Sequence, residues 1–204
     1  MSANPEPRQE QTPADAFEPL RSVEGQLVPV AGVWVIDPGH SSLAFEARHM
    51  VITRMRGRFR SFSGELHIAD EPEKSWAEVS ISAASLDTTN DAADDSLKGE
   101  RFLDVERFPT IHYLSSSVRH VEGNRWLLDG TLTIRDIGRP IALDFTFEGA
   151  VPAGKAARAK AGFLARGEFD RRDFGMDFNL PIPSGGWVVG NRVRLELDVE
   201  ANLP

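Results

Sequence analysis

Residues 141–148 read Ile-Ala-Leu-Asp-Phe-Thr-Phe-Glu, an alternation of apolar and polar side chains over eight positions. Residues 193–200, Val-Arg-Leu-Glu-Leu-Asp-Val-Glu, repeat this pattern near the end of the chain. Because successive side chains of a β-strand point to opposite faces, a period of two predicts strands with one apolar and one polar face. Eight residues at about 3.3 Å each give a strand that is roughly 26 Å long.

Shorter segments with the same period lie between turn signals such as Pro38-Gly39. About eight amphipathic strands without long helices between them indicate an all-β, antiparallel sandwich or barrel. One short helix is expected at residues 91–98, with Asn90 as its N-cap and Gly99 as its end. The shorter segments are residues 43–47, 66–68, 79–83, 111–113, 132–134 and 163–165.

The composition excludes several classes of protein. The 204 residues suit one domain, and 23 Lys and Arg against 31 Asp and Glu give a net charge of −8. That balance argues against a broad electrostatic contact with nucleic acid or with anionic lipid head groups, and no nucleic-acid partner is expected. The chain has no cysteine, which excludes disulfides and thiolate metal sites. No apolar run reaches the roughly 18 residues of a transmembrane segment.

Residues 1–32 differ from the rest of the chain. They hold five of the thirteen prolines and five acidic residues, and Phe17 is their one aromatic residue. So few large apolar groups do not offset the entropy lost on ordering, and we expect a flexible N-terminal extension followed by a folded domain at 33–204. The polar opening lacks the basic and apolar regions of a signal peptide, which favours a cytoplasmic location.

No convincing active site is visible. His40 and His49 are nine residues apart, so on one continuous strand they would point to opposite faces. Neither a closely spaced His/Asp set nor a Gly-x-Ser-x-Gly motif occurs. We therefore expect no catalytic residue, no bound metal and no cofactor, and we expect His40 to make a structural hydrogen bond near its turn.

The apolar faces of the expected strands define a candidate lumen. A barrel of eight strands is either filled by its own side chains or holds one small ligand, and the period of two does not distinguish these cases. The side chains expected to face inward are Phe45, Ile81, Ile111, Tyr113, Phe145, Phe147, Phe163, Leu195 and Leu197.

An ordered series of short motifs across residues 33–201 resembles the YceI-like family, whose members are lipocalin-like barrels described as binding polyisoprenoids. A histidine at His49 and the helix around Asp95 and Leu97 fit the same series. The motifs are WVIDPGHSSLAF (34–45), GRF (57–59), SLDT (85–88), FLD (102–104), FPTI (108–111), GTLTI (130–134), RPI (139–141) and RRDFGM (171–176).

The resemblance implies an antiparallel eight-stranded lipocalin-like β-barrel with one or two short helices. It also implies a non-enzymatic role, namely binding or carriage of a long-chain isoprenoid-type lipid, such as a polyprenyl or isoprenoid-quinone-like molecule. The candidate ligand contacts are the inward side chains named above together with His49 and Phe174, which lie in or beside the family motifs.

Two other functions stay open at this stage. One is an enzyme that acts on a bound isoprenoid or quinone with His40 or His49 as its acid-base group. The other is a filled barrel that serves as a protein-interaction module. A homodimer is the assembly under consideration, and the identity of the ligand does not follow from the sequence.

Overall fold

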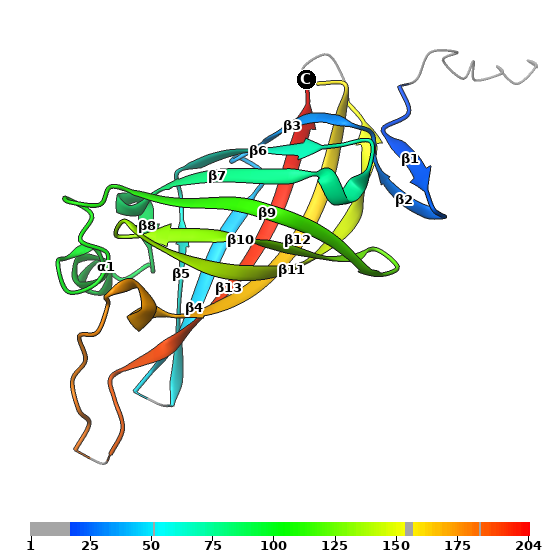
Figure 1. The fold of residues 1–204 in the computed structure, drawn as a ribbon. Helices are drawn as coiled ribbons and strands as arrows, with labels where there is room; N and C mark the ends of the chain where they lie inside the picture. The colour runs from blue at the N-terminus through cyan, green and yellow to red at the C-terminus, as the bar shows by residue number, and fades with distance from the viewer. Residues whose placement is uncertain (1–16, 51, 154–156, 184) are drawn as a thin grey trace, which may run out of the picture.

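The computed structural model describes residues 17–50, 52–153, 157–183 and 185–204 (Figure 1). The barrel wall is built from β3 (Gly32–Ile36), β4 (Ser42–His49), β5 (Thr53–Phe59), β6 (Phe62–Ile68), β7 (Trp76–Ser82), β9 (Thr110–Glu122), β10 (Arg125–Ile134), β11 (Ile137–Pro152), β12 (Ala159–Asp170) and β13 (Val189–Leu203). The remaining elements are β1 (Leu20–Val23), β2 (Gln26–Pro29), β8 (Leu86–Asp87), α1 (Asp91–Lys98), and the 3₁₀ turns η1 (Pro72–Lys74), η2 (Ala83–Ser85) and η3 (Arg171–Phe174).

The strands close into an eight-stranded antiparallel barrel. β3 and β4 act as one bent strand, because both pair with β13. β5 and β6 act as a second bent strand, because they pair with β4 and β3, so the ten segments of the wall make eight strands. β6 continues through β7, β9, β10 and β11 to β12, and the β12–β13 pair closes the ring. The predicted fold class is therefore confirmed.

The strands on one side of the barrel are longer than the eight residues expected. β11 has 16 residues and β13 has 15, so each runs for roughly 50 Å at 3.3 Å per residue. The alternation in β11 is interrupted by a register shift between Phe147 and Gly149, where Gly149 takes a φ of +133°. The strand continues beyond this bulge, which a strict period of two does not show.

Helix α1 closes one end of the barrel. The Asn90 side chain accepts a hydrogen bond from the Ala93 backbone N–H at 3.2 Å, and Gly99 follows the last helical residue. The predicted helix and its two ends are thus confirmed. Asp94, in the first turn of the helix, is buried and accepts hydrogen bonds from the backbone N–H and the hydroxyl of Thr88 at 2.8 and 2.6 Å.

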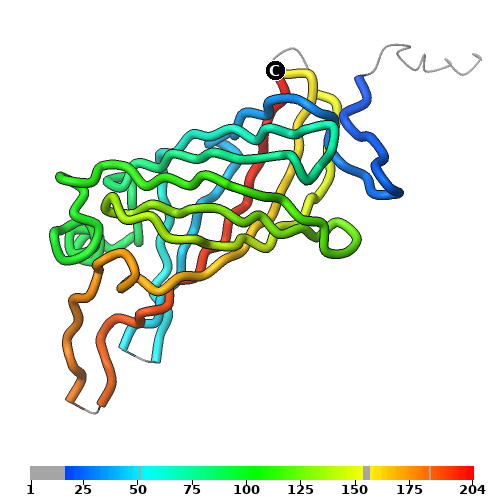
Figure 2. The backbone as a smooth tube through the Cα atoms, in the orientation of Figure 1, coloured from blue at the N-terminus to red at the C-terminus, as the bar shows by residue number. Residues whose placement is uncertain are grey.

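Strands β1 and β2 form a hairpin at the opposite end of the barrel from α1 (Figures 1 and 2). Residues 20–29 thus form two strands within the N-terminal extension, residues 1–16 lie outside the described part of the chain, and the expected boundary between extension and domain at residues 32 and 33 stays a prediction. Arg21 anchors the hairpin, donating to the carbonyl oxygens of Ala69 and Asp70 at 2.5 and 2.6 Å. Average composition does not predict these contacts, because they join residues that lie 48 and 49 positions apart in the sequence.

None of the helices in the described ranges has the length and apolar character that a bilayer crossing requires.

Candidate functional site

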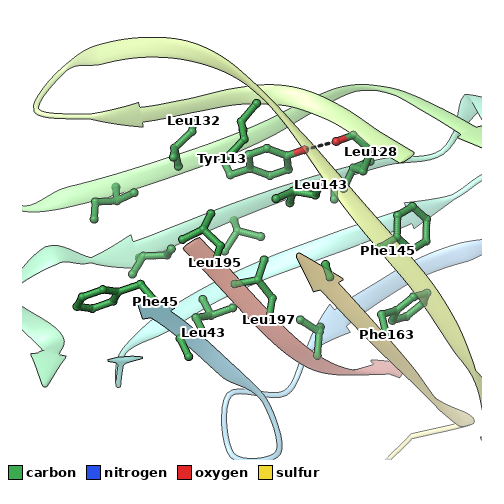
Figure 3. Close-up of a pocket in the computed structure, with 18 of the residues that line it drawn as sticks. Leu43, Phe45, Tyr113, Leu128, Leu132, Leu143, Phe145, Phe163, Leu195 and Leu197 are labelled. Atoms are coloured by element: carbon green, nitrogen blue, oxygen red, sulfur yellow. Dashed lines mark hydrogen bonds between the residues drawn. The ribbon is translucent and has the colours of Figure 1, made fainter. Parts of the chain in front are cut away.

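The interior of the barrel holds a cavity of about 260 Å³. A single water needs only about 10–15 Å³ measured in this way, so the space is far larger than a packing defect. Side chains from strands on all sides of the barrel point into it, and Figure 3 shows Phe45, Leu132, Phe145 and Leu195 around the same space.

The inward row of β13 shows that this barrel is not filled by its own side chains. Val193, Leu195, Leu197 and Val199 all line the cavity, yet each is only partly buried. Inward residues of a close-packed core are fully buried because neighbouring side chains cover them. The accessible surface of this row therefore faces the internal space.

Two glycines make room for aromatic rings in the cavity wall. Gly57 lies across from Phe45 in the β4–β5 pair, and a Cβ at Gly57 would collide with the Phe45 ring. A Cβ at Gly130 would lie 2.7 Å from Tyr113 Cζ. The Phe45 ring thus covers Gly57, and the Tyr113 ring covers Gly130. Both rings line the cavity.

The Tyr113 side chain brings a hydroxyl group to the cavity wall, and this hydroxyl already has a hydrogen-bond partner in the protein. Its hydroxyl donates a hydrogen bond to the Leu128 carbonyl oxygen at 3.1 Å (Figure 3). Burial raises the pKa of the Tyr113 phenol well above its usual range. The group therefore stays neutral, and the middle of the cavity carries no charge from this residue.

Nine of the eleven predicted contacts lie in the cavity wall, and two do not. His49 is at the end of β4 outside the lining, and Phe174 is buried in the core, edge-on to Phe169 with ring centroids 5.1 Å apart. Phe174 belongs to η3 and not to a strand, so its burial comes from packing against the barrel end. The nine lining residues are Phe45, Ile81, Ile111, Tyr113, Phe145, Phe147, Phe163, Leu195 and Leu197.

Sequence reasoning named no lumen residue from β3 and β6, where Ile36, Leu66 and Ile68 line the cavity, or from β10 and β5. In β10 the inward positions are Trp126, Leu128, Leu132 and Ile134, a period of two that Gly130 interrupts. In β5 the inward positions alternate with arginines, and Gly57 breaks the pattern in the same way. In both strands an apolar period of two was present, and a glycine in the inward row concealed it.

An arginine lies at each end of the cavity lining. Arg21 reaches it from the β1–β2 hairpin, together with Val28 and Pro29 from the same hairpin. Arg171 reaches it from η3 at the end that carries α1. These two guanidinium groups, with Ser75 and Tyr113, are the main polar side chains in a lining that is otherwise apolar.

Arg171 is 3% exposed and is held by acceptors around it. It donates to the carbonyl oxygens of Gly190, Met176 and Phe178 and to Asn191 Oδ1, the last at 3.0 Å. Burial lowers the pKa of its guanidinium. These bonds tie η3 to the start of β13, so Arg171 fixes the shape of this end of the cavity.

His40 lies outside the barrel, at the bend between β3 and β4. Its Nδ1 is 2.9 Å from Asp37 Oδ2 and 3.7 Å from Glu200 Oε1. Asp37, His40 and Glu200 could together offer metal ligands, but the Lys160 ammonium group binds Glu200 at 2.5 Å and lies 4.0 Å from Asp37. A lysine thus already supplies the positive charge there, and the hydrogen bond expected of His40 is confirmed.

The cavity offers an apolar wall to a bound molecule. No aspartate, glutamate, lysine or histidine of the described residues lines it, and burial keeps the Tyr113 phenol neutral. A closed antiparallel barrel with an apolar interior is the architecture of proteins that hold a small apolar ligand. The fold and the site therefore define a lipocalin-like binding barrel.

Comparison with known proteins gives this class a family. A family model described as a YceI-like domain matches residues 34–201. The chain belongs to the YceI-like domain family, and the resemblance seen in the sequence is confirmed. A UPF0312 protein of Staphylococcus aureus (strain MSSA476) is 27% identical over 174 residues, covering 83% of this chain and 97% of that protein.

Solved structures show the same fold. BcnA of Burkholderia cenocepacia aligns with a TM-score of 0.68 at 20% identity, covering 82% of this chain and 99% of BcnA. A YCEI protein of Campylobacter jejuni gives 0.62 at 23% identity, with 77% and 90% covered. A domain of Saccharophagus degradans described as polyisoprenoid binding gives 0.60 at 13% identity, with 84% and 98% covered.

Proposed function

We propose that this protein binds and carries a long-chain isoprenoid-type lipid inside its barrel. The observation that carries the proposal is the open apolar space whose lining extends from the β1–β2 hairpin to η3. Burial of a hydrocarbon chain contributes about 0.8 kcal/mol per CH₂ group before ordering costs. The structural neighbour from Saccharophagus degradans, which is described as polyisoprenoid binding, supports this class of ligand.

The two alternative functions find less support in the geometry. An enzyme that uses His40 or His49 needs one of them beside the bound molecule, and neither lines the cavity. A filled barrel finds less support, because the inward row of β13 is only partly buried and lines the cavity. Cytoplasmic location and assembly into a homodimer stay predictions.

Filling the cavity tests the proposal. Ala165 lines the lumen from β12, and the preceding residue, Leu164, points outward and is 37% exposed. Ala165→Phe places a ring in the space that the lipid needs, whereas Leu164→Phe adds a ring to the outer face of the same strand. Titration with a fluorescent polyprenyl probe measures the difference between the two variants.

We expect Ala165→Phe to bind the probe at least about tenfold more weakly, a loss of about 1.4 kcal/mol. It should keep its thermal midpoint, because the ring enters an existing cavity and does not overpack a filled core. Leu164→Phe should bind like the wild type. Equal binding by all three proteins, or no binding by the wild type, would contradict the proposal.

A further inference from the structure

Two loop ends carry exposed apolar side chains beside one another at the edge of the barrel. Met50 and Ile52 lie in the connection between β4 and β5, and Leu180 and Trp187 lie between η3 and β13. Ile52 is 80% exposed, and the other three are between 42% and 55% exposed. We call these four residues the apolar tip.

Backbone hydrogen bonds join the two loops into one unit. Met50 N–H donates to the Val188 carbonyl oxygen at 2.8 Å, and Val188 N–H donates to the Leu180 carbonyl oxygen at 3.0 Å. Trp187 pairs with Pro181 through an isolated β-bridge. Figures 1 and 2 show both loops projecting from the barrel in the same direction, so a flat surface can contact them together.

The strands that lead to the apolar tip carry an excess of positive charge. Arg54 and Arg56 of β5 and Arg194 of β13 all lie within 4.0 Å of Glu46. Arg192 and Arg194 lie at similar distances from Glu168. Four arginines thus share two carboxylates, in a chain whose net charge is −8.

The cavity lining reaches the base of the same loops. Val189, directly after Val188, lines the cavity, and so do Met55 of β5 and Ala47 of β4. Apolar surface therefore continues from the inside of the barrel to the strands that hold the apolar tip. An aromatic side chain among aliphatic ones, with arginines behind them, matches a bilayer interface, where apolar groups enter and cations meet lipid phosphates.

We propose that the apolar tip docks on the surface of an anionic phospholipid bilayer, with Arg54, Arg56, Arg192 and Arg194 facing the head groups. This surface goes beyond the proposed lipid carriage, because contact with a bilayer does not need an occupied cavity. It would place the base of the β4–β5 and β13 strands, where Val189 and Met55 line the cavity, next to the membrane.

Flotation with vesicles tests the docking surface. Full-length protein is mixed at low salt with vesicles of phosphatidylcholine alone, or of phosphatidylcholine and phosphatidylglycerol at 7:3, and the floated fraction is measured. The wild type should float with the anionic vesicles only, and 0.5 M NaCl should release it, since salt screens exposed charges.

Matched variants locate the contact. Leu180→Ser in the apolar tip is compared with Leu114→Ser on the barrel wall, because the two leucines are 53% and 51% exposed. Arg54→Gln is compared with Arg119→Gln, whose guanidinium lies on β9 against Asp129. Leu180→Ser should lower the vesicle affinity markedly and Arg54→Gln by about fivefold, and both controls should bind like the wild type.

The outcomes separate this proposal from lipid carriage. Ala165→Phe fills the cavity and should still float, so a failure of probe binding leaves the docking result intact. No flotation of the wild type, or equal loss in the tip and control variants, overturns the docking surface. A wild-type dimer in sedimentation velocity that Leu180→Ser makes monomeric, without vesicle binding, assigns the tip to self-association and also overturns it.

Discussion

At the scale of single residues, the pair Gly57 and Phe45 shows how the width of the cavity is set. The Phe45 ring covers Gly57 on the neighbouring strand, and both face the interior. Any side chain at position 57 must push the ring away from the wall. The width of the lumen therefore depends on glycine positions such as Gly57 as well as on the side chains that line the wall.

Gly57→Ala should destabilise the barrel by about 1–3 kcal/mol, the usual cost of overpacking a fitted contact, and should weaken binding of the polyprenyl probe. Gly162→Ala is the control, since the nearest atom to its added Cβ, Glu148 Cβ, is 3.6 Å away. Urea unfolding of both variants measures the difference. Equal free energies of unfolding would show that the Phe45 ring moves without cost.

The same residue pair marks the limit of sequence reasoning. Alternation in residues 193–200 predicted an inward row correctly, because each inward position carries a large apolar side chain. In β5 the inward row includes Gly57, and the side chain that covers it is Phe45 of the preceding strand, β4. A cross-strand contact of this kind depends on the register, which one-strand periodicity does not contain.

Asp37 is the residue with the clearest effect of pH. The hydrogen bond from His40, followed by that from the Gly39 backbone N–H, lowers the pKa of the Asp37 carboxyl from 3.8 to about 2. The folded state thus favours the ionised form, so the stabilisation is complete above the unfolded pKa of about 4 and is lost as the pH falls toward 2.

We expect Asp37→Asn to have a lower thermal midpoint than the wild type at pH 6, and the difference to shrink between pH 4 and pH 2. Thermal unfolding of the two proteins across this range measures the difference. A gap that stays constant with pH would show that the ionised carboxylate does not stabilise the bend between β3 and β4.

At the scale of elements, the β1–β2 hairpin closes one end of the cavity without joining the barrel sheet. An isolated two-stranded hairpin is marginally stable, so its packing on the barrel holds it in place. Val28 of this hairpin is 4% exposed and packs in a cluster with Val118 and Trp126. The matched region of the family model begins at residue 34, so the hairpin lies outside the part that defines the family.

Val28→Asp should release the hairpin, because an unpaired carboxylate is costly in an apolar contact. We expect a small fall in the thermal midpoint and faster uptake of the polyprenyl probe in stopped-flow measurements. Leu27→Asp is the control, since Leu27 is 62% exposed. Uptake at the wild-type rate in Val28→Asp would mean that the hairpin does not obstruct entry.

The elements differ in how well their sequences predict them. Helix α1 was predictable because its cap, Asn90, and its end, Gly99, act locally. The hairpin was not, because Arg21 binds carbonyl groups that lie 48 and 49 residues further along the chain. Contacts at such separations are decided by the folded barrel and leave no local pattern.

At the scale of the whole molecule, the central question is whether the barrel is hollow. Period-two strands predict an antiparallel sandwich or barrel, and in a barrel the same pattern fits a filled or an empty interior. Small and missing side chains in the wall, such as Ala165 and Gly57, together with the curvature of eight strands, leave the space open. That outcome follows from packing in three dimensions and from no single segment.

Native mass spectrometry of the purified protein tests this central claim most directly. We expect one bound molecule per chain, seen as an added mass. Organic extraction should identify it as a long-chain isoprenoid-type lipid, and incubation with a polyprenyl lipid should restore the added mass where the purified protein has lost it. Ala165→Phe should show the mass of the chain alone under both conditions. A wild-type protein that shows only its own mass, before and after incubation with the lipid, would contradict the account.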